Sequence, residues 1–235
     1  MTRSLRAGVV AIAAIATGIG LSGCGSDTKS AEPTTSKETT SASASATTSK
    51  AAPAPPPPGA AGPNKTIVDY IKEAGIVEAP VQRGDPGSPT IDLPFPPGWE
   101  DAGNRKPEWA YGAIVFSDPA MAENPPTIIA LVSKLTGNVD PAKVLEYAPG
   151  EIKNLPGYEG APEGTPTTLS GFDAVQIGGI YTKDGVKRAI AQKTVVIPGQ
   201  DGLYVLQLNA DGTEDQMGPL MDATTAIDEQ TTITP

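Results

Sequence analysis

Residues 172–210 read FDAVQIGGIYTKDGVKRAIAQKTVVIPGQDGLYVLQLNA, and they decide the architecture of the chain. Apolar and polar residues alternate in three runs, which is typical of half-buried strands. Asp184-Gly185 separates the first run from the second, and residues 199–202 separate the second from the third. Asp-Gly between alternating runs favours a tight hairpin. The stretch therefore predicts three consecutive antiparallel strands.

The first of these strands contains the pair Gly178-Gly179. Glycine inside a strand indicates either a bulge or the close approach of another group. A structural bulge without a ligand is the favoured interpretation.

The N-terminal part of the same domain begins with a segment of helical periodicity. Residues 67–74 carry apolar side chains at helical spacing, and Gly75 is expected to end the helix. Asn64 is the expected N-cap, because its short polar side chain can accept from the first free backbone N–H groups.

Two more helices are expected further along the chain. Asp140 followed by Pro141 is typical of a helix start, and Pro149-Gly150 should break or kink that helix. Thr213 and Gln216 fit a capping box for a C-terminal helix, although Pro219 is an alternative first residue. That helix should place one side against the core: Leu220, Thr224 and Ile227.

Three other segments read as strands. Residues 89–95 alternate, which predicts an edge strand with Ile91, Leu93 and Phe95 on one side. Residues 111–117 and 127–135 are dense apolar runs, as expected for strands covered on both faces. Residues 118–126 between them should form a loop.

The order of these elements predicts an α+β fold. It runs helix, three strands, helix, three strands, helix, and hairpins join the later strands. We therefore expect a single, mainly antiparallel sheet flanked by helices, in one domain that spans residues 63–235. The 173 residues of this range can bury a substantial core.

Residues 1–23 have the composition of a lipoprotein signal peptide. Arg3 and Arg6 precede an uncharged stretch over residues 7–20, which is too short to span a bilayer. The sequence LSGC at 21–24 resembles the bacterial lipobox. That resemblance implies cleavage before Cys24, the only cysteine of the chain, and attachment of a diacylglycerol to its Sγ.

Residues 24–62 follow as the lipidated cysteine and a tether rich in Ser, Thr, Ala and Pro. This composition offers almost nothing to bury and predicts disorder. We expect the tether to hold the domain near the outer face of the cell membrane. Two or more acyl chains are enough to anchor a protein stably.

The charge of the domain disfavours two kinds of partner. Residues 63–235 contain 24 Asp and Glu against 12 Lys and Arg. This surplus of negative charge disfavours nucleic acids and anionic lipid headgroups. The contact with the membrane is therefore expected to run through the acyl anchor on Cys24.

The residues needed for common catalytic mechanisms are missing. The sequence has no histidine, and an acylated Cys24 leaves no free thiol. Catalytic triads, Cys-His pairs and imidazole metal sites are therefore excluded. We predict no catalytic residue, no metal site, no cofactor and no enzymatic activity. Paired carboxylates remain the one route to hydrolysis.

One segment concentrates aromatic and charged side chains. Residues 96–112 read PPGWEDAGNRKPEWAYG, and aromatic faces beside hydrogen-bonding groups are suited to sugar rings. The alternative is that the tryptophans close one end of the core. The candidate residues are Trp99, Trp109 and Tyr111, with Glu100, Asp101, Arg105, Lys106 and Glu108.

Several stretches resemble the LpqN-type lipoproteins of mycobacteria. They include AGPNKTIVDYI at 61–71, PPTIIALVSKLTG at 125–137, DPAKVLEYAPGEIKNLPGY at 140–158 and AIDEQTTITP at 226–235. GDPGSPTIDLP, AQKTVVIP and YVLQLNA match as well. The resemblance covers nearly all of residues 61–235. It implies a PsbP-like fold, an envelope lipoprotein without assigned catalysis, and work beside trehalose-mycolate exporters.

Two classes of function stay open. The first is an accessory or carrier protein that binds an envelope glycolipid or a membrane transporter. The second is an interaction protein whose target is another protein, including a host protein, as the resemblance implies for some members. A carboxylate-based hydrolase is a distant third. An apolar pocket with a few polar groups would favour the first class.

Overall fold

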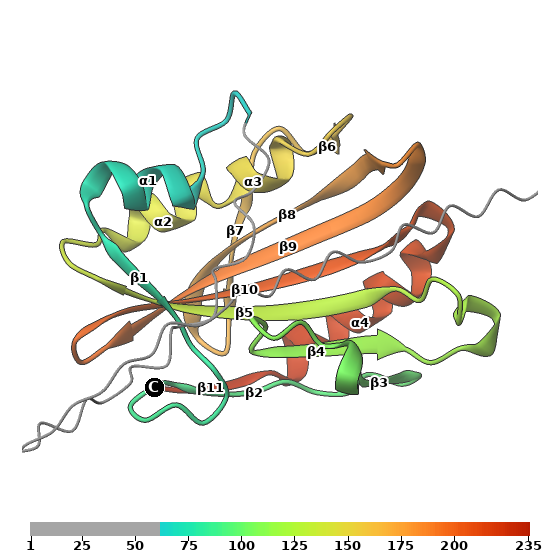
Figure 1. Cartoon of the computed structure of the whole chain (residues 1–235), viewed down its shortest axis with the longest axis horizontal. Helices are drawn as coiled ribbons and strands as arrows, with labels where there is room; N and C mark the ends of the chain where they lie inside the picture. The colour runs from blue at the N-terminus through green and yellow to red at the C-terminus, as the bar shows by residue number, and fades with distance from the viewer. Residues whose placement is uncertain (1–61) are drawn as a thin grey trace, which may run out of the picture. The chain divides into compact units, whose positions relative to one another are not determined.

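The structure, a computed structural model, describes residues 62–235 (Figure 1). Its centre is the predicted meander of β8 (Phe172–Lys183), β9 (Val186–Gly199) and β10 (Gly202–Thr213). All pairings in the main sheet are antiparallel. The sheet order is β3 (Trp99–Asp101), β4 (Gly112–Phe116), β5 (Thr127–Thr136), β10, β9, β8 and β6 (Glu159–Gly160). The α+β prediction is confirmed.

Two short strands extend the edges of this sheet. β1 (Val77–Pro80) pairs with β5, and β7 (Thr165–Leu169) pairs with β8. The expectation of a single sheet was wrong in one respect. β2 (Thr90–Asp92) and β11 (Thr232–Thr234) form a separate two-stranded sheet.

The turn between β8 and β9 is the predicted hairpin. Asp184 and Gly185 both have positive φ, 52° and 78°, as a tight two-residue turn requires. The predicted bulge at Gly178-Gly179 is absent, because the pairing of β8 with β9 runs without a skipped residue. The glycines instead permit close approach. A Cβ on Gly179 would lie 2.6 Å from Cε2 of Tyr158 and 2.7 Å from the carbonyl oxygen of Glu159.

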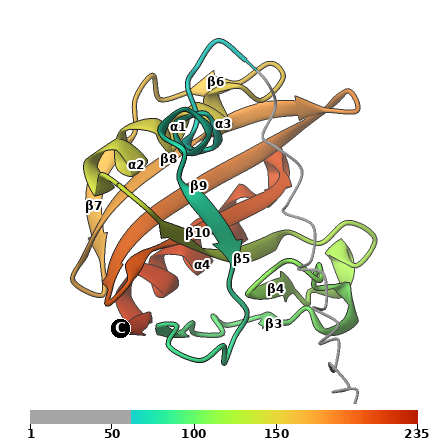
Figure 2. The same ribbon diagram turned by 60° about the vertical axis from the view of Figure 1, so that its left-hand side comes forward.

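Helices cover both faces of the sheet. α1 (Ile67–Ala74), α2 (Pro141–Tyr147) and α3 (Pro149–Lys153) lie on one face, and α4 (Met217–Gln230) lies on the other (Figure 1). Figure 2 shows α1 nearly end-on, with β1 leading from it toward β5. Each face has its own apolar core. α4 contributes Leu220, Ala223 and Ile227 to one core, and α1 and α2 contribute Ile67, Tyr70 and Val144 to the other.

The start of α1 differs from the prediction. Thr66, and not Asn64, is the N-cap, and it forms a capping box with Asp69. The predicted end is correct, since Gly75 has a φ of 63° and caps the C-terminus. Asn64 was misassigned because its side chain bonds to Asn154, 90 residues away.

The other helix starts follow the sequence more closely. Asp140 accepts a hydrogen bond from the backbone of Ala142, and α2 and α3 meet at the predicted break before Pro149. The capping box of Thr213 and Gln216 opens a 3₁₀ turn, η3 (Glu214–Gln216). α4 continues from that turn at Met217, so the alternative start at Pro219 was wrong.

Strand burial was predicted with mixed success. β4 is buried on both faces at its centre, as expected, but β5 alternates between buried and half-buried residues. The chain leaves β2 after Asp92, so Phe95 is 59% exposed instead of sharing the buried side with Ile91. The predicted loop at 118–126 contains a short 3₁₀ turn, η2 (Pro119–Met121).

The expected signal peptide (1–23), Cys24 and nearly all of the tether (24–62) lie outside the described residues. Within residues 62–235, none of the helices has both the length and the apolar character needed to cross a membrane.

Candidate ligand-binding site

The aromatic segment at 96–112 does not assemble a sugar platform. Trp99 and Tyr111 are buried in the core beneath α4, and the Trp99 ring lies 5.6 Å from that of Phe116. The Tyr111 hydroxyl accepts a hydrogen bond from the backbone N–H of Ile91. The alternative interpretation, that the aromatic residues close the core, is therefore correct for these two. Trp109 is the exception, because it lines a cavity.

The charged residues of that segment lie outside the cavity. Glu100 forms an exposed ion pair with Arg105 at 3.3 Å. Lys106 donates to the carbonyl oxygen of Ala110 at 2.9 Å. Asp101 accepts from the backbone of Gly103, and Glu108 is exposed. These residues stabilise local turns.

The cavity that Trp109 lines lies between the layer of α1 and α3 and the sheet, and its volume is about 530 Å³. Most of its wall is apolar and comes from α1, α3 and the neighbouring strands. This wall consists of Ile67, Val68, Ile71, Pro80, Leu131, Val132, Leu135, Ile152, Leu155, Ile190 and Val205. A concave, mainly apolar site with a few polar groups is the usual form of a small-molecule site.

Four polar side chains meet in this cavity and are here called the polar floor: Glu151, Gln192, Gln207 and Asn209. Nε2 of Gln192 donates to Oε2 of Glu151 at 3.3 Å and to Oδ1 of Asn209 at 2.9 Å. Nε2 of Gln207 donates to the same Glu151 oxygen at 3.2 Å. Burial of polar groups destabilises a protein unless they are hydrogen-bonded. This hydrogen-bonded cluster therefore stands out within a mainly apolar lining.

The strand register explains how the floor is assembled. Gln192 on β9 lies directly opposite Asn209 on β10. Gln207 is two residues earlier on β10 and therefore shares the face of Asn209. Glu151 reaches them from α3. The approach of α3 to the segment before α1 depends on Gly150, where a Cβ would lie 2.0 Å from the carbonyl oxygen of Lys65.

The environment of Glu151 alters its acidity. Burial raises the pKa of this carboxyl, and the negative charge of Glu78 acts in the same direction. The hydrogen bonds from Gln207 and Gln192 oppose the shift by stabilising the carboxylate. Glu78 also lines the cavity. Among the described residues of the lining there is no lysine or arginine to attract an anion.

Tyr181, which also lines the cavity, belongs to a second polar group. Its hydroxyl donates to Oδ2 of Asp211 at 2.6 Å, and Nε of Arg188 donates to Oδ1 of the same carboxylate at 2.8 Å. Burial, followed by the contact with Asp211, raises the pKa of Tyr181 to about 12. The phenol therefore stays protonated and ties β8 to β10.

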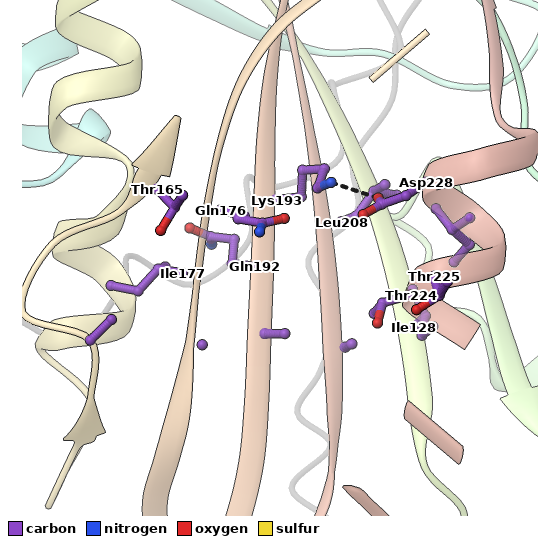
Figure 3. A pocket seen from close by; sticks show the side chains of 15 residues that line it. Ile128, Thr165, Gln176, Ile177, Gln192, Lys193, Leu208, Thr224, Thr225 and Asp228 are labelled. Carbon is purple, nitrogen blue, oxygen red and sulfur yellow. Dashed lines mark hydrogen bonds and ion pairs between the residues drawn. The ribbon is translucent and has the colours of Figure 1, made fainter. Parts of the chain in front are cut away.

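A second hollow lies on the opposite face of the sheet, beside α4 (Figure 3). Its volume is about 390 Å³, and an adjoining hollow of about 270 Å³ shares Ala191, Ala210 and Thr224 with it. The bottom of this hollow consists of small residues, because Gly178, Ala191 and Ala210 are paired in register across β8, β9 and β10.

The two ends of this hollow differ in polarity. At one end, Lys193 and Asp228 form an ion pair at 2.6 Å, drawn as a dashed line in Figure 3. At the other end, Met217 and Met221 are exposed on α4. The ion pair satisfies the buried Lys193 ammonium, so no free charge points into this hollow from that pair. The cavity with the polar floor is therefore the better candidate for a ligand-binding site.

Sequence reasoning missed the polar floor. Gln207 and Asn209 alternate with apolar residues in LYVLQLNA, a pattern that reads as a solvent-facing side. A signal was nevertheless present, because Gln192 begins a run of three polar residues, Gln192 to Thr194, in the middle of a strand with apolar residues on either side. Within residues 62–235, no cluster of three acidic or thiol side chains could hold a metal ion.

The comparisons with known proteins agree with this architecture. The model of the family described as "Probable lipoprotein LpqN" matches residues 63–234. The chain belongs to the LpqN family. It is 58% identical to lipoprotein LpqN of Mycobacterium tuberculosis (strain ATCC 25618 / H37Rv) over 228 residues, which cover 96% of this chain and 97% of that protein.

A solved member of the LpqN family has a similar structure. It is described as a crystal structure of LpqN involved in cell envelope biogenesis of Mycobacterium tuberculosis. The match has a TM-score of 0.71 and 58% identity, and it covers 74% of this chain and all of the solved chain. The resemblance seen in the sequence is therefore confirmed at the level of the family and of the α+β fold.

Proposed function

We propose that this chain is a membrane-anchored lipoprotein that binds an amphipathic glycolipid of the cell envelope and does not convert it. The polar floor within a mainly apolar cavity is the observation that carries this proposal. Apolar walls suit an acyl chain, whereas the amides and carboxyl of the floor suit a hydroxylated head. Trp109 at the same cavity offers an aromatic face to a sugar ring.

The membership of the LpqN family supports an envelope role, because the solved relative is described as involved in cell envelope biogenesis. An acyl group on Cys24 would keep the domain at the outer face of the cell membrane. We propose that it works there beside membrane exporters of mycolate or trehalose glycolipids. The acidic domain disfavours anionic heads, so a neutral sugar such as trehalose is the preferred head.

The test is to titrate the protein with a short-chain trehalose ester and to follow amide chemical shifts by NMR. Chromatography of the same samples measures released acid. The proposal expects shifts confined to residues around the polar floor, with the ester intact. Release of acid that stops on mutation of Glu151 would show a hydrolase instead. An absence of shifts at millimolar ester would favour a macromolecular partner, such as a transporter or host protein.

A pair of variants locates the binding. Trp109→Ala removes the aromatic face from the cavity and should weaken ester binding about tenfold, a typical loss for an aromatic contact. Phe95→Ala is the matched control, because Phe95 is exposed and does not line the cavity. Equal binding by wild type and Trp109→Ala would place the ligand elsewhere.

A further inference from the structure

We infer that the polar floor admits a ligand head that carries hydroxyl groups and no negative charge, and that Glu151 is the residue that makes this selection. The inference rests on the proposed binding function and assigns the head-group chemistry of that same cavity to named atoms.

The argument begins with the hydrogen bonds that the floor leaves unused. Oε2 of Glu151 accepts from both glutamines, and Oδ1 of Asn209 accepts from Gln192. Within residues 62–235, no protein group bonds to Oε1 of Glu151, Oε1 of Gln207 or Nδ2 of Asn209. Among the polar atoms of the floor in the described residues, Oε1 of Gln192 is the one that is buried without a partner.

The floor therefore offers two acceptors and one donor to whatever enters the cavity. A hydroxyl both donates and accepts, so a polyol satisfies all three atoms with one kind of group. A phosphate or carboxylate only accepts, and it would bring a negative charge beside Glu151 and Glu78. An ammonium only donates, and it would leave the Nδ2 group of Asn209 unpaired.

Glu151 is the residue whose charge distinguishes a neutral ligand head from an anionic one. It is the one floor residue that can ionise, and it contacts both glutamines. Hydrogen bonds from a ligand hydroxyl to a carboxylate are stronger than those to a neutral amide. The same carboxylate opposes an anionic head, because the lining has no cation in its described residues to compensate. Glu151 therefore favours a hydroxylated head and disfavours an anionic one.

The experiment uses two probes with the same eight-carbon chain, trehalose 6-octanoate and octyl phosphate, below their micellar concentrations. The protein is the chain from residue 25 onward, so that no acyl anchor competes for the cavity. Isothermal titration at pH 7.5 measures both affinities for wild type and for Glu151→Gln. This substitution keeps the shape and one oxygen acceptor but removes the charge.

Wild type should bind the trehalose ester and reject octyl phosphate. Glu151→Gln should weaken ester binding about tenfold, as expected for the loss of a hydrogen bond to a charged group. It should also raise the affinity for octyl phosphate at least about tenfold. Glu146→Gln is the matched control, since Glu146 pairs with Lys143 on α2 outside the cavity and its loss changes the net charge equally.

Asn209→Ala provides a second, independent variant. It removes the free Nδ2 donor, together with the oxygen that accepts from Gln192, without changing the charge. Ester binding should therefore fall about tenfold while octyl phosphate stays excluded. Unchanged affinities in both Glu151→Gln and Asn209→Ala would overturn the inference. An equal gain of phosphate binding in Glu146→Gln would also overturn it, because overall charge would then explain the selection.

The two proposals fail in different ways. If wild type does not bind the ester at millimolar concentration, the proposed function fails. If wild type binds the ester and octyl phosphate equally well, glycolipid binding survives and only the selection by Glu151 is overturned.

Discussion

Asn64 and Asn154 hold each other through three hydrogen bonds across 90 residues of sequence. The backbone N–H and the side-chain Nδ2 of Asn64 both donate to Oδ1 of Asn154, each at 3.0 Å. Nδ2 of Asn154 returns a bond of 2.8 Å to the carbonyl oxygen of Asn64. This pair fixes the entry of α1 to the end of α3, and both helices bound the candidate cavity.

The first prediction concerns where the domain begins. A chain that starts at Pro63 should unfold at the same temperature as one that starts at residue 25, because the tether contributes no core residue by composition. A chain that starts at Lys65 loses the Asn64 pair and should be about 1–3 kcal/mol less stable. Thermal and urea unfolding measure both. A lower melting temperature for the Pro63 chain would show that the tether packs on the domain.

The second prediction concerns the close approach at Gly179. Gly179→Ala should destabilise the protein by about 1–3 kcal/mol, since the added methyl group meets Tyr158 and backbone atoms of β6. Gly112→Ala is the control in β4 of the same sheet, where the nearest atom to the added Cβ, Nη2 of Arg83, is 3.9 Å away. Urea unfolding compares the two, and equal stabilities would contradict the packing around Gly179.

The third prediction is a pH dependence that originates at Glu151. Burial raises the pKa of this carboxyl above its ordinary value of 4.5, so the folded state keeps a proton that the unfolded chain has released. The folded state then binds more protons within the window between the two pKa values. The contribution of Glu151 to stability therefore falls as the pH rises through that window and returns on acidification.

Glu151→Gln should remove this dependence. The free energy of unfolding of wild type, measured relative to Glu151→Gln, should improve between pH 7.5 and pH 5. Urea unfolding at both pH values gives the comparison, with Glu146→Gln as the exposed control. A relative free energy that worsens toward pH 5 would show that the hydrogen bonds from the glutamines outweigh burial.

The fourth prediction concerns the anchor. Cys24→Ser removes the sulfur that the lipobox resemblance marks for acylation, and the described domain is untouched. The variant should leave the membrane fraction, which fractionation and immunoblotting can measure. Ser22→Ala, within the same motif, is the matched control and should stay with the membrane. Retention of Cys24→Ser in the membrane would contradict the lipobox interpretation.

Local patterns were sufficient to predict the centre of the fold. The meander of β8, β9 and β10 follows from alternation and from Asp184-Gly185, both of which act between neighbouring residues. The short edge strands β1, β3, β6 and β7 were not identified, because two to five residues carry too little periodicity. The cap at Asn64 was wrong because its partner is distant in sequence.

The candidate site was less predictable for a related reason. The polar floor consists of ordinary Gln, Asn and Glu residues, and the face that they occupy becomes interior only when α3 packs over β8 and β9. No single stretch of sequence encodes that packing. The aromatic segment, by contrast, was visible in the sequence, yet only Trp109 of its three aromatic residues lines the cavity.

The pairing of β11 with β2 sets the time at which the fold can be completed. The last strand of the chain pairs with one that precedes it by 140 residues or more, and Ile233 lies opposite Ile91 in their register. Synthesis proceeds from the N-terminus at about 5–20 residues per second, so β2 waits several seconds for its partner. Any protein that binds the nascent chain therefore encounters it before β2 and β11 have paired.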